Sequence, residues 1–214
     1  MMRDFTMLGP ATSSNESRKS SSDRASRPAR TQDSSNDFVE LIRSLFQHPS
    51  AIAIVGSCCA PDSDTGPDSA SFVAEGLAAE LGSTGNRVVV VPVTKLLRMN
   101  PVILSERSAF LPGRDPHVWM WPASFGQTLE FFECGDSRGK GDWLDSLRRN
   151  FYSVVLDCPY VEGMPGVTEV AAMADAAVLA VEAHRTSREQ IQRNQQVLQV
   201  RGIRIAGCIL IQER

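Results

Sequence analysis

Several features that would place a protein in a class are absent or scarce in this sequence of 214 residues. No apolar run approaches the roughly 18–20 residues that span a membrane, and the start, MMRDFTMLGP, has no apolar stretch long enough for a secretory signal. Positive and negative charges nearly cancel, with Lys+Arg 22 against Asp+Glu 25 and a formal net charge of -3. Such a chain has no bulk electrostatic reason to bind nucleic acid or an anionic bilayer. These absences predict a cytoplasmic protein with no transmembrane segment and no nucleic-acid partner.

Cysteine is also scarce, and its five copies are scattered. No two of them have the C-x-x-C spacing of a zinc site, and an odd count fits no disulfide framework. The chain is therefore predicted to keep reduced thiols. One adjacent pair, Cys58-Cys59, stands before a possible helix start, where a thiol pKa can be lowered. This pair leaves open a redox-sensing or small-ligand-sensing role.

The composition changes along the chain. Residues 1–36 are rich in Ser, Arg and Asp, and after Leu8 they contain no large apolar residue. Such a segment buries too little surface to offset its ordering entropy, so we predict a disordered tail. Residues 37–214 have globular patterning and are predicted to form a single domain, which begins with an amphipathic helix over DFVELIRSLFQ.

Short, fully apolar runs alternate with helical patterns through most of this domain. Runs of this kind are typical of strands buried on both faces, which occur in parallel sheets covered by helices. The predicted strands are 51–56, 87–93, 117–121, 152–157, 175–183 and 203–212, and the predicted helices include 69–85, 142–150, 165–174 and 186–202. In the last helix, Thr186 and Glu189 fit the S/T-x-x-E capping box. The pattern predicts an α/β three-layer sandwich with a mostly parallel central sheet.

Lysine is missing where a phosphate-binding loop would need it. A working P-loop reads G-x-x-x-x-G-K-[ST], in which backbone amides and the lysine hold phosphate and the hydroxyl holds magnesium. The strand 51–56 ends at Gly56 and is followed by a loop and a helix, but no lysine occurs from residue 20 to residue 94. The loop instead carries Asp62, Asp64 and Asp68, and like-charge repulsion opposes polyphosphate binding there.

The order of these segments resembles the cytoplasmic ATPase domain of bacterial tyrosine kinases that serve capsule and exopolysaccharide synthesis. That family belongs to the wider MinD/ParA-like class of P-loop ATPases. The resemblance covers roughly residues 37–212. It is strongest over YSVVLDCPYVEG and HRTSREQIQRNQQVLQVRGIRIAGCILIQ. It implies a P-loop NTPase-like fold.

The resemblance also assigns candidate site positions and shows where they depart from the family. Asp157 falls on the Walker B aspartate, and Gln212 stands where relatives usually place an asparagine that reads adenine. The family's second acidic motif falls on 92–94, Pro-Val-Thr, where both aspartates are missing. The implied phosphate-loop positions are degenerate: Gly56, Ser69, Ala70 and Ser71.

Three hypotheses follow for the function. In the first, the chain is a pseudo-ATPase for which no cofactor is expected. It would act by protein contacts in exopolysaccharide or capsule synthesis, in the cytoplasm or peripherally at the inner face of the cytoplasmic membrane. Its partner would be a membrane chain-length regulator, a related ATPase or a second copy. In the second, it is an active ATPase or tyrosine kinase that binds ATP and magnesium through Ser71 and Asp157. A lysine would then come from Lys95, Lys140 or a partner subunit. The third is the sensing role of Cys58 and Cys59.

Overall fold

The computed structural model describes residues 3–8, 50–57, 69–98, 108–121, 130–132, 142–161 and 165–213. Several predictions fall outside these ranges. They concern the amphipathic helix before residue 50, residues 9–36 of the tail, the Cys58-Cys59 pair, the three loop aspartates and Lys140.

Nine strands of the described chain form one sheet with the order β1-β9-β8-β2-β7-β3-β5-β4-β6. Neighbours from β9 to β5 are parallel, whereas β1 pairs antiparallel with β9, and β4 pairs antiparallel with β5 and β6. The sheet is therefore mostly parallel, as predicted. Its strands are β1 (Arg3–Leu8), β2 (Ser50–Gly56), β3 (Val88–Pro92), β4 (Ser108–Pro112), β5 (Val118–Met120), β6 (Glu130–Phe132), β7 (Ser153–Cys158), β8 (Ala176–Glu182) and β9 (Ile205–Glu213).

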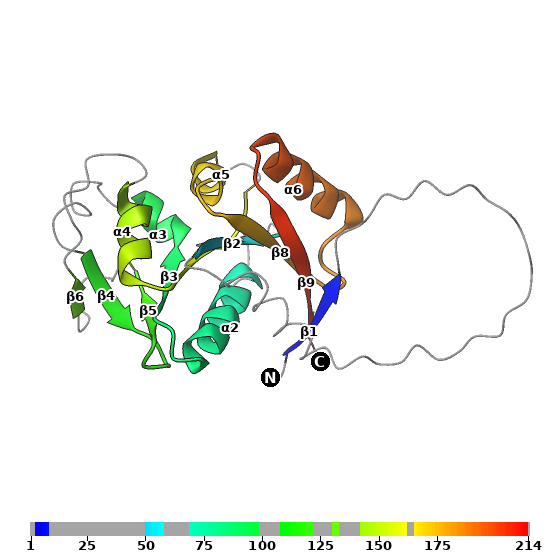
Figure 1. Cartoon of the computed structure of the whole chain (residues 1–214). Helices are drawn as coiled ribbons and strands as arrows, with labels where there is room; N and C mark the ends of the chain where they lie inside the picture. Colours follow the sequence, from blue (N-terminus) through cyan, green and yellow to red (C-terminus); the bar gives the residue numbers. More distant parts are fainter. Residues whose placement is uncertain are drawn as a thin grey trace, which may run out of the picture.

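Helices cover both faces of this sheet, which gives the three layers (Figure 1). One face packs against α2, and the other packs against the remaining described helices. The strands β2, β3 and β7 are buried at every position, because both of their faces meet a helix layer. The described helices are α2 (Ser69–Ser83), α3 (Val93–Arg98), α4 (Asp142–Asn150), α5 (Pro165–Ala171) and α6 (Arg188–Val200).

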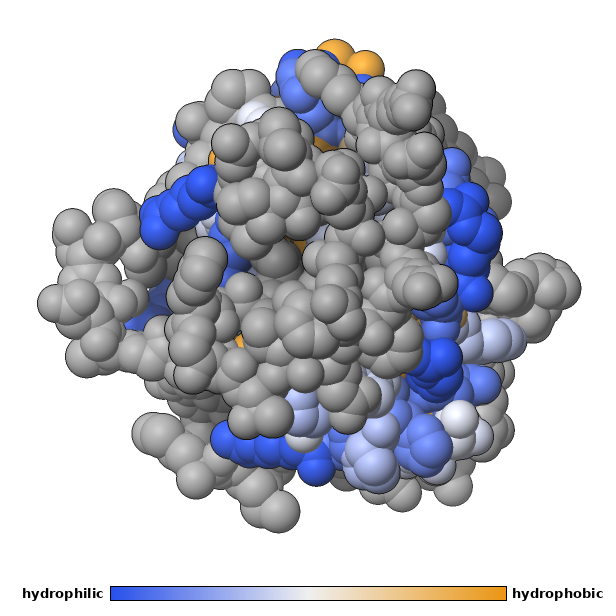
Figure 2. Space-filling view, turned by 90° about the vertical axis from the view of Figure 1, so that its left-hand side faces the viewer, coloured by the Kyte–Doolittle hydropathy of each residue, from blue (hydrophilic) through white to orange (hydrophobic). Residues whose placement is uncertain are grey.

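Apart from β1, the predicted strands and helices agree with the observed ones to within a few residues, but three further elements were not predicted. Two of them, β4 and β6, lie in the less regular middle of the chain, and α3 follows β3 without a loop. No helix among the described residues is both long and apolar enough to cross a bilayer. On the side shown in Figure 2, the described surface is mostly hydrophilic, with hydrophobic residues visible only in small patches.

The structure differs from the sequence prediction at the N-terminus. Arg3–Leu8 forms β1 beside β9, although residues 1–36 were predicted to be disordered. The physical reason is that an edge strand presents a row of backbone N–H and C=O groups, which a distant segment can pair with. Composition alone does not reveal this opportunity, because the edge exists only after the sheet has formed.

The cap of α6 also differs from the prediction. Its N-cap is Ser187, which forms a capping box with Gln190, rather than Thr186 with Glu189. The Thr186 hydroxyl oxygen instead accepts a hydrogen bond from the backbone N–H of Glu182 at 3.1 Å. Two consecutive hydroxyl residues could each cap the helix, and the bond that Thr186 accepts from Glu182 decides between them.

Candidate functional site

Four strands bring their carboxyl ends to one edge of the sheet, where ligands of parallel α/β folds bind. The register places Asp157 of β7 between Ile54 of β2 and Pro92 of β3. On the other side of β2, Gly56 pairs with Ala180 of β8. The segments that follow these residues form the candidate site.

Gly56 ends β2 in a space that admits no side chain. A Cβ atom at this position would overlap the carbonyl oxygen of Pro159, and it would lie 3.5 Å from the Cβ of Ala70. Pro159 follows β7 and Ala70 belongs to the first turn of α2, so glycine lets three elements meet closely at this point. Packing therefore requires a glycine at this position, and its assignment to a phosphate loop stays a prediction.

Ser57, the next residue, is fully buried and is tied to the end of β8. Its hydroxyl donates a hydrogen bond to the carbonyl of Ala180, and its backbone N–H donates to the same carbonyl at 3.0 Å. Its Oγ also lies 3.3 Å from the Oγ1 of Thr186. Sequence reasoning missed this contact, because the only signal was a hydroxyl residue directly after a buried strand.

The structure brings together the two residues that the resemblance assigned to magnesium. Ser71 lies in the first turn of α2, and its hydroxyl donates a hydrogen bond of 2.8 Å to Oδ2 of Asp157 at the end of β7. Asp157 is only 7% exposed. A hydroxyl and a carboxylate are both ligands that magnesium accepts. The pair fits a metal site, and it also links β7 to α2 without any metal.

The charge of Asp157 affects its neighbour in β7. Burial, and to a smaller extent the Asp157 carboxylate, raise the pKa of the Cys158 thiol well above its usual value. Cys158 is thus an uncharged, buried thiol at neutral pH, and it is a poor nucleophile.

By the resemblance, Ala70 stands at the position of the P-loop lysine, and it is 0% exposed. Its neighbour Ser69 is also buried, so the first turn of α2 is packed into the fold. The alternative lysine of the described chain, Lys95, lies in α3, directly after β3, and its side chain is exposed. The residues at the start of α2 therefore offer a polyphosphate no cationic side chain.

Gln212 lies near the end of β9, two strands away from β2, and its side chain is exposed. In the sheet it pairs with Asp4 of β1. No hydrogen bond that we observe within the described part of the chain joins it to Ser71 or Asp157. Its adenine-reading role stays a prediction, as does the role of Cys58 and Cys59.

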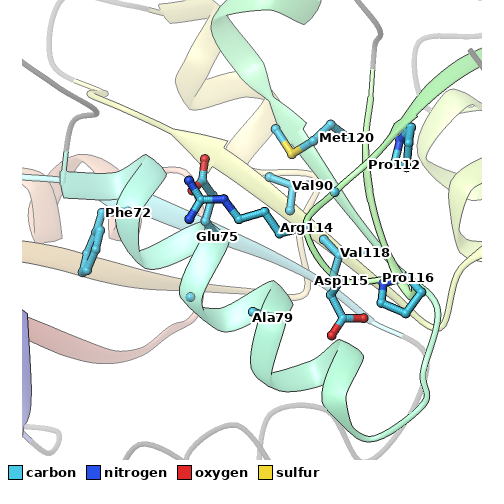
Figure 3. Close-up of a pocket in the computed structure, with 12 residues that line it drawn as sticks. Phe72, Glu75, Ala79, Val90, Pro112, Arg114, Asp115, Pro116, Val118 and Met120 are labelled. Carbon is cyan, nitrogen blue, oxygen red and sulfur yellow. The ribbon is translucent and has the colours of Figure 1, made fainter. Parts of the chain in front are cut away.

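A groove that sequence reasoning missed runs along α2. It has a volume of about 820 Å³ and lies between α2 and the turn from β4 to β5. Val90, Val118 and Met120 lie at its base, and Arg114 extends from the turn towards Glu75 on α2 (Figure 3). The small residues Gly76 and Ala79 on the facing side of α2 leave room for it.

Within the described ranges, no group of three His, Cys, Asp or Glu side chains could hold a metal ion, in this groove or elsewhere.

Comparison with known proteins supports the fold. No protein-family model matches this chain, and no curated protein matches its sequence. Solved structures do match it. The kinase domain of VpsO has a TM-score of 0.58 at 14% identity, over 83% of this chain and 92% of that one. The chimerical protein CapA2B2 has a TM-score of 0.55 at 11% identity, over 86% of both chains.

Two further structures extend the comparison. The kinase domain of the Escherichia coli tyrosine kinase ETK has a TM-score of 0.53 at 15% identity, over 82% of this chain and 76% of that one. The septum site-determining protein MinD from Pyrococcus horikoshii, complexed with Mg-ADP, has a TM-score of 0.50 at 17% identity, over 74% and 68%. The chain thus has the MinD-like P-loop NTPase fold, and the resemblance to bacterial tyrosine kinase domains is confirmed at the level of the fold.

Proposed function

We propose that this chain is a catalytically degenerate P-loop protein that acts through protein contacts, as a regulatory or scaffolding component of bacterial exopolysaccharide or capsule synthesis. The pathway follows from the sequence resemblance. A membrane chain-length regulator, a related ATPase or a second copy is the partner that this resemblance implies.

The observation that carries the proposal is the environment of Ala70. Phosphoryl transfer depends on positive charge around the phosphates, to which the P-loop lysine contributes. Here the corresponding residue is a buried methyl group, packed near Gly56. The sequence of the preceding loop adds three aspartates, which repel a polyphosphate. The edge of the sheet therefore keeps the shape of a nucleotide site while its charge opposes the ligand.

A second candidate function is supported by the Ser71–Asp157 pair. By the resemblance, these two side chains stand where an active P-loop holds magnesium, and they lie within hydrogen-bond distance of each other. With a lysine from Lys95, Lys140 or a partner subunit, the chain would be an ATPase or tyrosine kinase. This alternative requires magnesium-dependent nucleotide binding.

Titration calorimetry of the whole chain with ATP and ADP, with and without magnesium, distinguishes the degenerate protein from the active enzyme. We expect no heat of binding up to millimolar nucleotide, with circular dichroism showing a folded protein. Micromolar affinity that needs magnesium and is lost in Asp157→Asn would overturn the proposal in favour of the enzyme. Ser83→Ala is the matched control, because its hydroxyl bonds only within the end of α2, to the carbonyl of Glu80.

A further inference from the structure

The pairing of β1 with β9 joins the two ends of the described chain. Six residue pairs run antiparallel, from Arg3 opposite Glu213 to Leu8 opposite Cys208, at the outer edge of the parallel strands (Figure 1). Residues 9–49 separate β1 from β2 in the chain. No tight turn fixes β1 on this edge, so its pairing can be lost without breaking any other strand pair of the sheet.

The register shows which kind of segment the edge accepts. Phe5 and Met7 of β1 stand opposite Ile211 and Ile209, which are almost fully buried in the core cluster on the α2 face. The intervening Thr6 stands opposite Leu210. Successive residues of a strand alternate between the faces of a sheet. The edge therefore selects an extended segment with apolar residues at alternate positions.

The first pair of the register sets Arg3 opposite Glu213, the last residue of β9. A segment that follows the register of β1 therefore begins opposite Glu213 and has apolar residues at alternate positions after it.

β9 is longer than the strand that covers it. Ile205–Gly207 extend past the last pair, and within the described part of the chain no strand pairs with their outer side. Val200, at the end of α6 and a few residues before β9, is 78% exposed. An incoming strand can pair with these three residues first and then replace β1 residue by residue.

We propose that the outer edge of β9 is a docking site for an extended segment of a partner protein, and that β1 covers this site until the partner displaces it. The partner segment pairs antiparallel with all nine residues of β9. It needs this extra length because β1 belongs to the same chain and its pairing avoids the entropic cost of association that the partner segment incurs. Main-chain pairing supplies affinity and the alternate side chains supply specificity, as in other strand additions. The inference does not depend on whether nucleotide binds.

The first test locks β1 in place. Leu8→Cys puts a thiol directly opposite the natural Cys208. Directly opposite residues of an antiparallel pair lie about 4.5–5.5 Å apart at Cα, within the range of a disulfide. Oxidation with diamide should give an intramolecular disulfide between the introduced thiol and Cys208, identified by peptide mapping. The double variant Leu8→Cys/Cys208→Ser is the control.

The probe is a fluorescein-labelled peptide that carries residues 3–8 followed by Thr-Val-Thr, so that it can pair with the whole of β9. Fluorescence anisotropy should show at least tenfold weaker binding to the oxidised Leu8→Cys protein than to the same protein after reduction. Oxidation of the control variant should leave its affinity unchanged.

The second test weakens the pairing of β1 with β9, so that the outer edge of β9 becomes available to the peptide. Alternate N–H groups of an edge strand point to its neighbour, so one of Thr6→Pro and Met7→Pro must remove a donor to β9. That variant should bind the peptide at least tenfold more tightly than the unaltered chain. Hydrogen exchange should show faster exchange in 208–213 and unchanged protection in β2 and β7, which establishes that the core remains folded.

Three results would overturn the proposal. One is equal peptide affinity in the locked and reduced states. Another is a Leu8→Cys protein that stays folded but forms no link to Cys208, or links only between molecules. The last is unchanged peptide affinity in both proline variants.

Discussion

The carboxyl ends of β7 and β3 lie side by side, yet they are built in opposite ways. Next to its last residue, β7 carries a buried carboxylate that is hydrogen-bonded to α2, whereas β3 ends in Pro92 and continues directly into α3. By the resemblance, both positions carry acids in active relatives. The difference is that the acid of β7 also connects two elements of the fold.

The largest effect should come from the packing beside β7. In Gly56→Ala the new methyl group overlaps the carbonyl oxygen of Pro159, and backbone atoms cannot turn away as a side chain can. We expect the free energy of unfolding to fall by about 3 kcal/mol or more. Urea denaturation followed by circular dichroism measures this loss.

The control for that variant is Gly85→Asn. Gly85 has a φ of 82° and open space around it, and asparagine tolerates this conformation. Its cost should stay below about 1 kcal/mol. An equal loss in the two variants would show that the close approach of β2 to Pro159 is not the cause.

The next effect concerns the bond between Ser71 and Asp157. In Asp157→Ala the Ser71 hydroxyl loses its acceptor, and we expect a loss of about 1–3 kcal/mol. A double-mutant cycle with Ser71→Ala should give a coupling energy of about 1–2 kcal/mol. Denaturation of the four proteins without magnesium supplies the cycle. A coupling energy near zero would mean that the carboxylate does not join β7 to α2.

Cysteine titration compares the interior of β7 with the edge of the sheet. Burial raises the pKa of Cys208 from 9.0 to about 11, and that of Cys158 is raised by burial together with the neighbouring Asp157 charge. Above about pH 9 the two thiols therefore stay protonated in the folded state, while they ionise in the unfolded state. Stability is complete below about pH 9 and falls as the pH rises towards 11, by at most about 1.4 kcal/mol per pH unit for each thiol.

Thermal melts between pH 8 and pH 11 measure this dependence. Cys208→Ala should flatten part of the slope, by less than the full value because Cys208 is partly exposed. The remaining slope should include the contribution of Cys158. An unchanged slope in Cys208→Ala would contradict the contribution assigned to the edge thiol.

The sequence was most informative where its pattern has one physical solution. Continuous apolar runs such as VVVV before Pro92 fit only strands covered on both faces, and the structure buries them fully. The meeting of Ser71 with Asp157 was predictable from the resemblance, since it places both at one edge of the sheet.

Features that depend on tertiary neighbours were not predictable. β1 forms because β9 is left at an edge, and Thr186 does not cap α6 because Glu182 and Ser57 lie beside it. The groove beside α2 depends on the position of the β4–β5 turn, which no local pattern determines. For β1 and for the groove, the deciding partner is remote in the sequence.

The smallest effect should come from returning an acid to the end of β3. Thr94 is half-buried in the first turn of α3. An aspartate there is stabilised by the helix dipole and destabilised by the charge of Asp157, and we expect the two effects to cancel. We therefore expect Thr94→Asp to change the free energy of unfolding by less than about 0.5 kcal/mol, and Thr94→Asn, its neutral match, to do the same. Urea denaturation of both variants beside Asp157→Ala makes the comparison direct. A loss in Thr94→Asp as large as that in Asp157→Ala, with Thr94→Asn unaffected, would mean that charge repulsion excludes an acid at this position.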